Sequence, residues 1–287
     1  MQIGIGLPAG MPNTPGQVVL DWARRADQAG FYSFGIIDRI VYPNYEPMIA
    51  LAAAAAVTQR ARLITVILIA TIRNAGILAK EAASIDLLSN GRLTLGLAVG
   101  GREDDFRAAP EPFEHRGTRF VEQVSLMRRV WAGQGVVEGD GPIGPKPVQP
   151  GGPPVIVGGS SPVALRRAGR IGEGYIAGTR DAPDIAVAFK TVEESWKAAG
   201  KSGRPRLVAI RYFALGPNAA ERGAVNLRDY YSSPGQGPER AVQAMITTPE
   251  RIKEHNKAFE DIGGDELVWL PTIAEVDQVD RLKDVVG

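Results

Sequence analysis

The sequence predicts an α/β fold, a (β/α)₈ barrel, on three observations. Short, continuous apolar runs recur along the 287 residues, and such runs are typical of parallel strands that are buried on both faces. Each run is followed by a segment with helical, 3.6-residue periodicity. Eight strand–helix units in a chain of this length match the size and period of the barrel. We therefore predict a single barrel domain over residues 1–287, with a doubly wound sheet as the alternative.

The first half of the chain contains four strand–helix units. Its expected strands are residues 3–7, 32–38, 63–70 and 93–99. Its expected helices begin near Val18, Pro47, Gly76 and Arg119. The first segment is typical of a helix, because its apolar side chains recur on one face and it ends at Gly30, a residue suited to a left-handed C-cap.

The second half resumes the pattern after a loop. Residues 133–154 are dense in Gly and Pro, which indicates a loop, with an interdomain linker as the alternative. Four more strands are expected to begin at Val155, Gly174, Leu207 and Glu266. Residues 217–248 interrupt the repeat after the seventh strand, so we predict an insertion there.

Composition excludes several classes of function. Lys and Arg total 33 and Asp and Glu 32, giving a net charge of +1 that provides no general attraction to nucleic acid or membranes. The chain has no cysteine, and its two histidines lie far apart, so no metal site is expected. The N-terminus lacks the pattern of a signal peptide, and no apolar run is long enough to span a membrane. We predict a cytoplasmic, soluble protein that acts on a small molecule.

Charged residues follow the buried strands at the ends where a barrel carries its chemistry. Asp38 and Arg39 follow the second strand, and the run Arg102 to Asp105 follows the fourth. A carboxylate at the end of a buried strand has little access to water, which favours a functional role for Asp38. Glu103 is a candidate general acid, although capping or solvating the next helix is the alternative for each acid of this run.

The segment VIVGGSSPVALRRAG predicts an anion site. Glycines allow close approach of the backbone, serines cap the helix and donate hydroxyl groups, and Pro162 suits the first helical turn. A helix N-terminus presents free N–H groups to a phosphate. An ordinary Ser-capped helix is the alternative. The candidate phosphate-binding residues are Gly158, Gly159, Ser160 and Ser161, with Thr179 and Arg180 after the sixth strand.

At these motifs the chain resembles the luciferase-like monooxygenase superfamily, barrel enzymes that use FMN or the deazaflavin coenzyme F420. The resemblance runs from Ile3 to about Pro271, and its most specific part is IDLLSNGRLTLGLAVGG. A second part is KPVQPGGPPVIVGGSSPVALRRAG. The family's order and spacing of these motifs are reproduced here.

The resemblance implies a cofactor ring across the barrel mouth and a phosphate held around the Gly-Gly-Ser segment. It places the end of the third strand, Ile69, Ala70 and Thr71, behind the ring, where some members have a non-prolyl cis peptide. Gly100, in the most specific motif, joins the predicted cofactor-binding residues. The resemblance also implies a homodimer, and it makes Tyr230 and Tyr231 in the insertion candidate lid residues, with packing on the surface as the alternative.

One departure from the family affects the chemistry. Many relatives have Asp-His after the second strand, whereas this chain has Asp38-Arg39. An arginine is permanently charged, so it holds an anionic ring, a phosphate or an acidic substrate but cannot shuttle protons near neutral pH. The candidate catalytic residues are therefore Asp38, Arg39 and Glu103.

The resulting prediction is an F420-dependent oxidoreductase that transfers a hydride between C5 of the deazaflavin and a small organic substrate. Similarity of the third-strand and Gly-Gly-Ser segments, with the missing histidine, favours F420. The alternative is an FMN-dependent monooxygenase that uses reduced flavin and O₂. A non-catalytic flavin-binding protein is the alternative of another class. A phosphate-sugar lyase or isomerase ranks last, because the expected lysine or paired carboxylates are absent.

Overall fold

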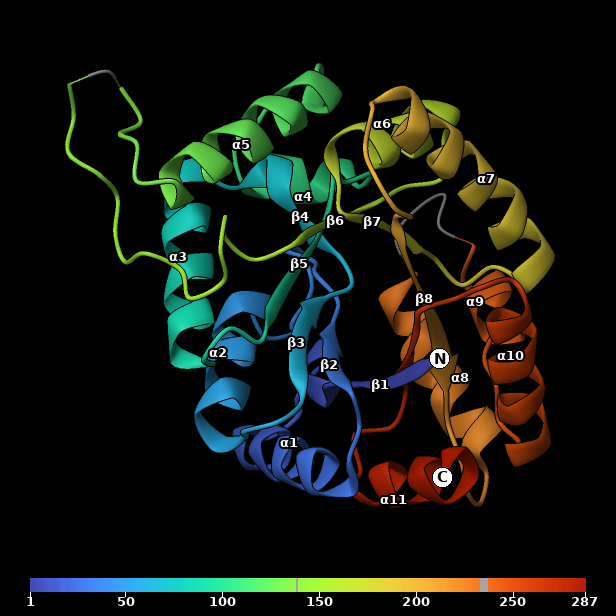
Figure 1. The fold of residues 1–287 in the computed structure, drawn as a ribbon. Helices are drawn as coiled ribbons and strands as arrows, with labels where there is room; N and C mark the ends of the chain where they lie inside the picture. Colours follow the sequence, from blue (N-terminus) through green and yellow to red (C-terminus); the bar gives the residue numbers. More distant parts are fainter. Residues whose placement is uncertain (138, 233–236) are drawn as a thin grey trace.

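A closed parallel barrel surrounded by helices forms the structure, a computed structural model that describes residues 1–137, 139–232 and 237–287 (Figure 1). Parts of the predicted loop 133–154 and of the predicted insertion 217–248 lie outside the described residues. The strand order is β3-β2-β1-β9-β8-β7-β6-β5-β4, and an additional β3–β5 pairing closes the sheet. Both β3 and β4 pair with β5, so they are two parts of one barrel strand. The predicted eight-stranded barrel is confirmed.

The strands match the predicted apolar runs closely. They are β1 Gln2–Gly6, β2 Ser33–Ile36, β3 Arg62–Thr65, β4 Leu68–Ile69, β5 Leu93–Ala98, β6 Val155–Gly158, β7 Gly174–Ala177, β8 Arg206–Phe213 and β9 Glu266–Pro271. The third predicted strand is the exception, because it is interrupted between β3 and β4. A non-prolyl cis peptide joins Val66 and Ile67 in that interruption. It precedes the residues at which the family resemblance placed such a bond.

The helices around the barrel include several that the periodicity did not separate. They are α1 Gly16–Ala29, α2 Pro47–Val57, α3 Ala75–Leu88, α4 Glu103–Ala108, α5 Arg116–Trp131, α6 Pro162–Ile171, α7 Ala182–Ala198, α8 Ala219–Tyr230, α9 Pro238–Gln243, α10 Pro249–Asp261 and α11 Asp277–Val286, with 3₁₀ turns η1 Pro8–Gly10 and η2 Ala70–Ile72. Helix α4 is built from the charged run after β5. Helices α8 and α9 belong to the predicted insertion, which is therefore helical rather than a simple loop.

Local sequence explains where the helices begin and end. Asn74 caps α3 by accepting a hydrogen bond from the Ile77 N–H, and Ser161 caps α6 in the same way. Gly30 ends α1 in the left-handed conformation (φ +86°), as predicted. In the part of the chain that the structure describes, no helix combines the length and apolar character needed to cross a membrane.

The barrel interior is filled by apolar side chains that leave no room for a larger residue at Gly96. A Cβ at this position would lie 1.9 Å from the Thr65 carbonyl oxygen and 2.4 Å from Ile176 Cδ1. Interior side chains such as Ile64, Val208 and Val268 are essentially inaccessible. This packing fixes β3, β5 and β7 relative to one another, and it sets the positions of the residues that follow them.

Candidate active site at the barrel mouth

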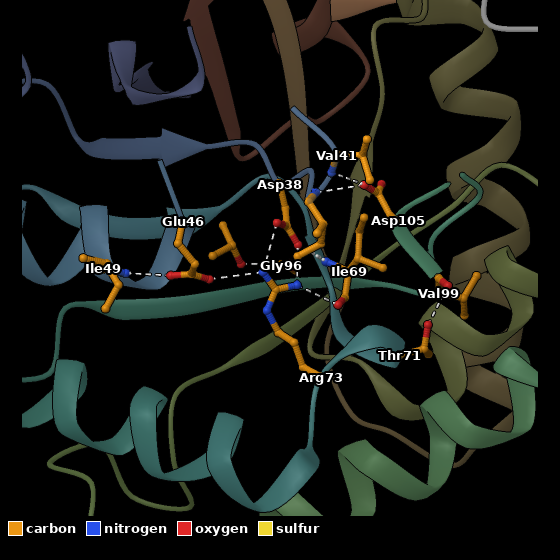
Figure 2. A network of polar contacts seen from close by, with 12 residues as sticks. Asp38, Val41, Glu46, Ile49, Ile69, Thr71, Arg73, Gly96, Val99 and Asp105 are labelled. Carbon is orange, nitrogen blue, oxygen red and sulfur yellow. Dashed lines mark hydrogen bonds and ion pairs between the residues drawn. The ribbon is translucent and has the colours of Figure 1, made fainter. Parts of the chain in front are cut away.

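A buried ion pair holds the ends of β2 and β4 together (Figure 2). Asp38 Oδ2 accepts hydrogen bonds from Arg73 Nη1 at 2.6 Å and from the Ile69 N–H at 2.8 Å, while Oδ1 accepts from Arg73 Nη2 at 3.0 Å. The Asp38 side chain is 1% exposed. Arg73 also donates to Glu46 at 3.1 Å, and the other Glu46 oxygen caps α2 at Ile49. Asp38 thereby fixes the backbone of Ile69.

These contacts define what Asp38 can do chemically. Burial raises the pKa of the Asp38 carboxyl, and the neighbouring Arg73 guanidinium opposes that shift. Both oxygens already accept hydrogen bonds from Arg73 or Ile69, so the group is directed at the barrel wall. The sequence placed Asp38 at a strand end, and it did not reveal that Asp38 forms a bidentate pair with Arg73.

The predicted ring-facing residues form one continuous wall. Gly100 has φ +72°, and a Cβ there would approach Ile69 Cγ2 within 2.6 Å, so these two residues are in close contact. Ala70 and Thr71 are fully buried, and the Thr71 hydroxyl donates to the Val99 carbonyl at 2.8 Å. Arg116 donates to the Gly100 carbonyl at 3.2 Å. Ala70 and Thr71 therefore support the wall from behind, while Ile69 and Gly100 form its edge.

Two arginines and two tyrosines gather beside this wall, a group that we call the arginine–tyrosine cluster: Arg39, Arg102, Tyr230 and Tyr231. Arg39 is buried, donates to the Tyr230 carbonyl at 2.5 Å and lies 3.5 Å from Asp104. The Arg102 guanidinium lies 5.2 Å from the Tyr230 ring centre and 5.6 Å from that of Tyr231. Arg102 Nη1 is enclosed and has no hydrogen-bond partner among the described residues.

The acidic run after β5 divides between two environments. Asp105 is fully buried, and its Oδ1 accepts from the Ile40 and Val41 N–H groups at 2.9 and 2.8 Å, which ties α4 to the loop after β2 (Figure 2). Glu103 is 69% exposed and lies 3.7 Å from Arg107 on the surface. The structure does not bring Glu103 together with Asp38 or Arg39. Its predicted acid role therefore has no supporting contact.

A hydrogen-bonded tyrosine pair lies under the end of α8. The hydroxyl groups of Tyr212 and Tyr231 are 2.9 Å apart, and Tyr230 packs edge-on against Tyr231. Tyr212 and Tyr230 also line a cavity of about 20 Å³ with Leu7, Ile37 and Leu270. That volume holds a single water and is too small for an organic molecule. Sequence reasoning missed Tyr212, an uncharged residue that lies inside β8, next to its last residue.

Alkaline titration tests the burial of these phenols. Burial raises the pKa values of Tyr212, Tyr230 and Tyr231, and also those of Tyr42 and Tyr175. An unfolded chain releases such protons near pH 10 while the folded chain retains them, so stability is expected to fall as pH rises above 10. At a given pH above 10, phenolate absorbance should show fewer ionised tyrosines in the folded protein than in the unfolded protein. Full ionisation without unfolding would contradict this placement.

The predicted anion site lies at the N-terminus of α6. Gly159, Ser160 and Ser161 are exposed, and Ser161 Oγ accepts from the Ala164 N–H at 3.2 Å while its own hydroxyl proton stays available. Gly159 has φ +138°, and a Cβ there would lie 2.6 Å from Ala164 Cβ. Tyr175 supports the turn by donating to the Gly159 carbonyl at 3.0 Å. These features leave an open backbone surface beside free N–H groups.

The residues after β7 have a less direct connection to this site. The charge of Arg180 opposes the burial that raises the Tyr175 pKa, so Arg180 lies near the phenol that supports Gly159. The Arg180 side chain also lines a small cavity with Arg211 and His255 on the side of α10. Thr179 is half-buried. The phosphate-binding roles of Thr179 and Arg180 therefore remain predictions.

Comparison with known proteins identifies the family. The sequence profile described as luciferase-like monooxygenase matches residues 1–286. The chain belongs to the luciferase-like monooxygenase family. An uncharacterised protein of Mycobacterium tuberculosis is 33% identical over 172 residues, covering 58% of this chain and 61% of its own length. This chain therefore spans about three fifths of that relative.

Two further proteins similar to this chain carry names that indicate chemistry. An F420-dependent glucose-6-phosphate dehydrogenase of Kribbella flavida is 30% identical over 223 residues, covering 70% of this chain and 66% of the relative. A monooxygenase from Streptomyces bottropensis has the same fold, with a TM-score of 0.83 at 21% identity, covering 99% of this chain and 97% of its own. The predicted resemblance and the enzyme class are confirmed.

The luciferase-like family uses F420 or FMN, and its members act on small substrates. Groups of acidic residues and histidines able to hold a metal ion are absent among the residues that the structure describes. In this family setting, the barrel mouth carries the guanidinium groups of Arg39 and Arg102 beside the ring of Tyr230.

Proposed function

We propose that the chain is an F420-dependent oxidoreductase that transfers a hydride between C5 of the deazaflavin and a small organic substrate. One observation carries the cofactor site: the wall of Ile69 and Gly100 and the turn of Gly159 to Ser161 lie at the carboxyl ends of three neighbouring strands. β4 pairs with β5, and β5 pairs with β6, so their carboxyl ends are adjacent. A ring on the wall and a phosphate on the turn are thus held by one continuous surface.

The turn before α6 fits a phosphate. It offers exposed backbone, the Ser161 hydroxyl and the positive end of a helix of 10 residues. Gly159 has no side chain, so the space above the first turn of α6 stays open. A Cβ at this position would collide with Ala164 Cβ. This site does not distinguish F420 from FMN, because both carry a phosphate. The 30% identical F420-dependent dehydrogenase of Kribbella flavida supports the choice of F420.

Once bound, F420 supplies hydride chemistry at its C5 atom, and the protein contributes binding and electrostatics. We assign Arg39 and Arg102 to the stabilisation of negative charge at the mouth, because a guanidinium stays protonated throughout the working pH range. The Tyr231 hydroxyl, paired with Tyr212, would donate a hydrogen bond to a substrate oxygen, because burial raises its pKa and keeps it protonated. Asp38 is a positioning residue, because it fixes the Ile69 backbone that supports the ring.

The direct test is an equilibrium titration of the purified protein with F420 and with FMN, each oxidised and reduced, followed by fluorescence. We expect F420 to bind at least about tenfold more tightly than FMN, a difference of about 1.4 kcal/mol. Preference for reduced FMN would replace the proposal with an oxygenase. Binding of neither would overturn the cofactor assignment, and binding without reduction by any donor would indicate a non-catalytic flavin-binding protein.

A further inference from the structure

An open basic groove lies between α5 and α6, at a site that the proposed chemistry does not use. It has a volume of about 650 Å³. Its lining is made by one face of α6, the first turns of α5 and one residue of α7: Val163, Arg166, Arg167, Arg170, His115, Gly117, Thr118, Val121 and Ser195. We call it the α5–α6 groove. None of these described lining residues is a carboxylate.

The arginines of the α5–α6 groove are not neutralised by the protein. Arg166, Arg167 and Arg170 form no ion pair with any residue in the described part of the chain. Burial and the nearby charge of Arg170 lower the pKa of Arg167, the direction expected when neighbouring cations repel one another. By contrast, Arg128 on the adjacent side of α5 is paired with Glu173 at 2.6 Å. The groove thus concentrates uncompensated positive charge.

The glycine at the start of α5 shapes this surface. A Cβ on Gly117 would lie 2.6 Å from Arg167 Nη2, so the guanidinium rests directly on the α5 backbone. The same guanidinium lies 5.8 Å from the centre of the buried Phe120 ring. Arg167 is therefore held against the groove wall, while Arg166 and Arg170 are exposed.

The groove begins where the phosphate turn ends. Val163 is the second residue of α6, directly after Ser161 and Pro162, and Arg166, Arg167 and Arg170 continue along the same helical face. At about 1.5 Å per residue, the distance from Val163 to Arg170 along the helix is about 10 Å. An extended chain covers about 3.3 Å per residue, so about three residues would match this length.

We propose that the α5–α6 groove binds a flexible chain of carboxylates attached to the phosphate of the cofactor. This inference rests on the proposed function and makes it more specific. F420 carries an oligoglutamate chain beyond its phosphate, and FMN ends at the phosphate. The groove would therefore select the deazaflavin coenzyme through its tail, independently of the ring. The exposed ion pairs are individually weak, so their combined effect is moderate and sensitive to salt.

The test compares F420 that carries its glutamate tail with F420 from which the tail has been removed and the phosphate retained. Binding is measured by cofactor fluorescence at low and at high salt, for the wild type and for the Arg166→Gln/Arg170→Gln variant. The control is Arg129→Gln/Arg251→Gln, which removes two exposed arginines from other surfaces and so changes the net charge equally.

We expect the tail to tighten binding to the wild type about fivefold to tenfold at low salt and much less at high salt. In Arg166→Gln/Arg170→Gln the tailed and tailless forms should bind equally, and the control should behave as the wild type. Equal binding of both forms to the wild type would overturn the groove while leaving the F420 assignment intact. Failure of both forms to bind would overturn the cofactor assignment and the groove with it.

Discussion

The Asp38→Asn variant is expected to lose about 3 kcal/mol of unfolding free energy, as measured by urea denaturation. The substitution removes the charge that pairs with Arg73 through two hydrogen bonds of 2.6 and 3.0 Å. It leaves a guanidinium that is only 13% exposed, with the partly exposed Glu46 as its remaining acidic partner. Removing one partner of a buried pair is costly because the other charge stays desolvated.

The matched control is Asp21→Asn, which breaks an ion pair with Arg24 on the surface of α1. Both side chains of that pair are more than 40% exposed, so its loss should change stability by less than about 1 kcal/mol. If the two variants lose the same stability, Asp38 does not hold the ends of β2 and β4 together. Its place in the site would then require another explanation.

The fold was predictable because each barrel strand is buried on both faces. Runs such as residues 93–98 carry no charge, so the apolar pattern alone marks them. Periodicity did not reveal the interruption between β3 and β4, because residues 63–70 form one uncharged run. Only the family resemblance indicated an unusual backbone near the end of this strand. Helix α4 was hidden for the opposite reason, since its six residues are mostly charged and are too short to show a periodic face.

The candidate site could be predicted only at positions where the residue type suits few structural roles. Glycine and serine at the start of α6 indicated the turn, and the structure shows the Ser161 cap that they favoured. Asp38 and Tyr231 were candidates, but their long-range partners gave no signal. The pairing of Tyr212 with Tyr231 spans 19 positions, and that of Asp38 with Arg73 spans 35. The first contact joins β8 to the end of the helix that follows it and the second joins segments after neighbouring strands, and sequence spacing encodes neither pairing.

The Gly159→Ala variant is expected to weaken binding of the cofactor at least about tenfold, measured as the dissociation constant in the fluorescence titration. At φ +138° an alanine is strained, and its methyl group would lie 2.6 Å from Ala164 Cβ in the first turn of α6. Ala164 has little freedom to move, because its N–H is held by Ser161. The turn must therefore shift, and the phosphate contacts shift with it.

Gly203→Ala separates this effect from general backbone strain. Gly203 also has positive φ (+69°), but a Cβ there meets nothing within 4 Å, and it lies in the loop before β8. Both variants should lose about 1 to 2 kcal/mol of unfolding free energy, whereas only Gly159→Ala should bind cofactor more weakly. Equal affinity of the two variants would remove the α6 turn from the cofactor site. A selective loss would assign the phosphate to this turn, since a strained backbone elsewhere leaves the binding surface unchanged.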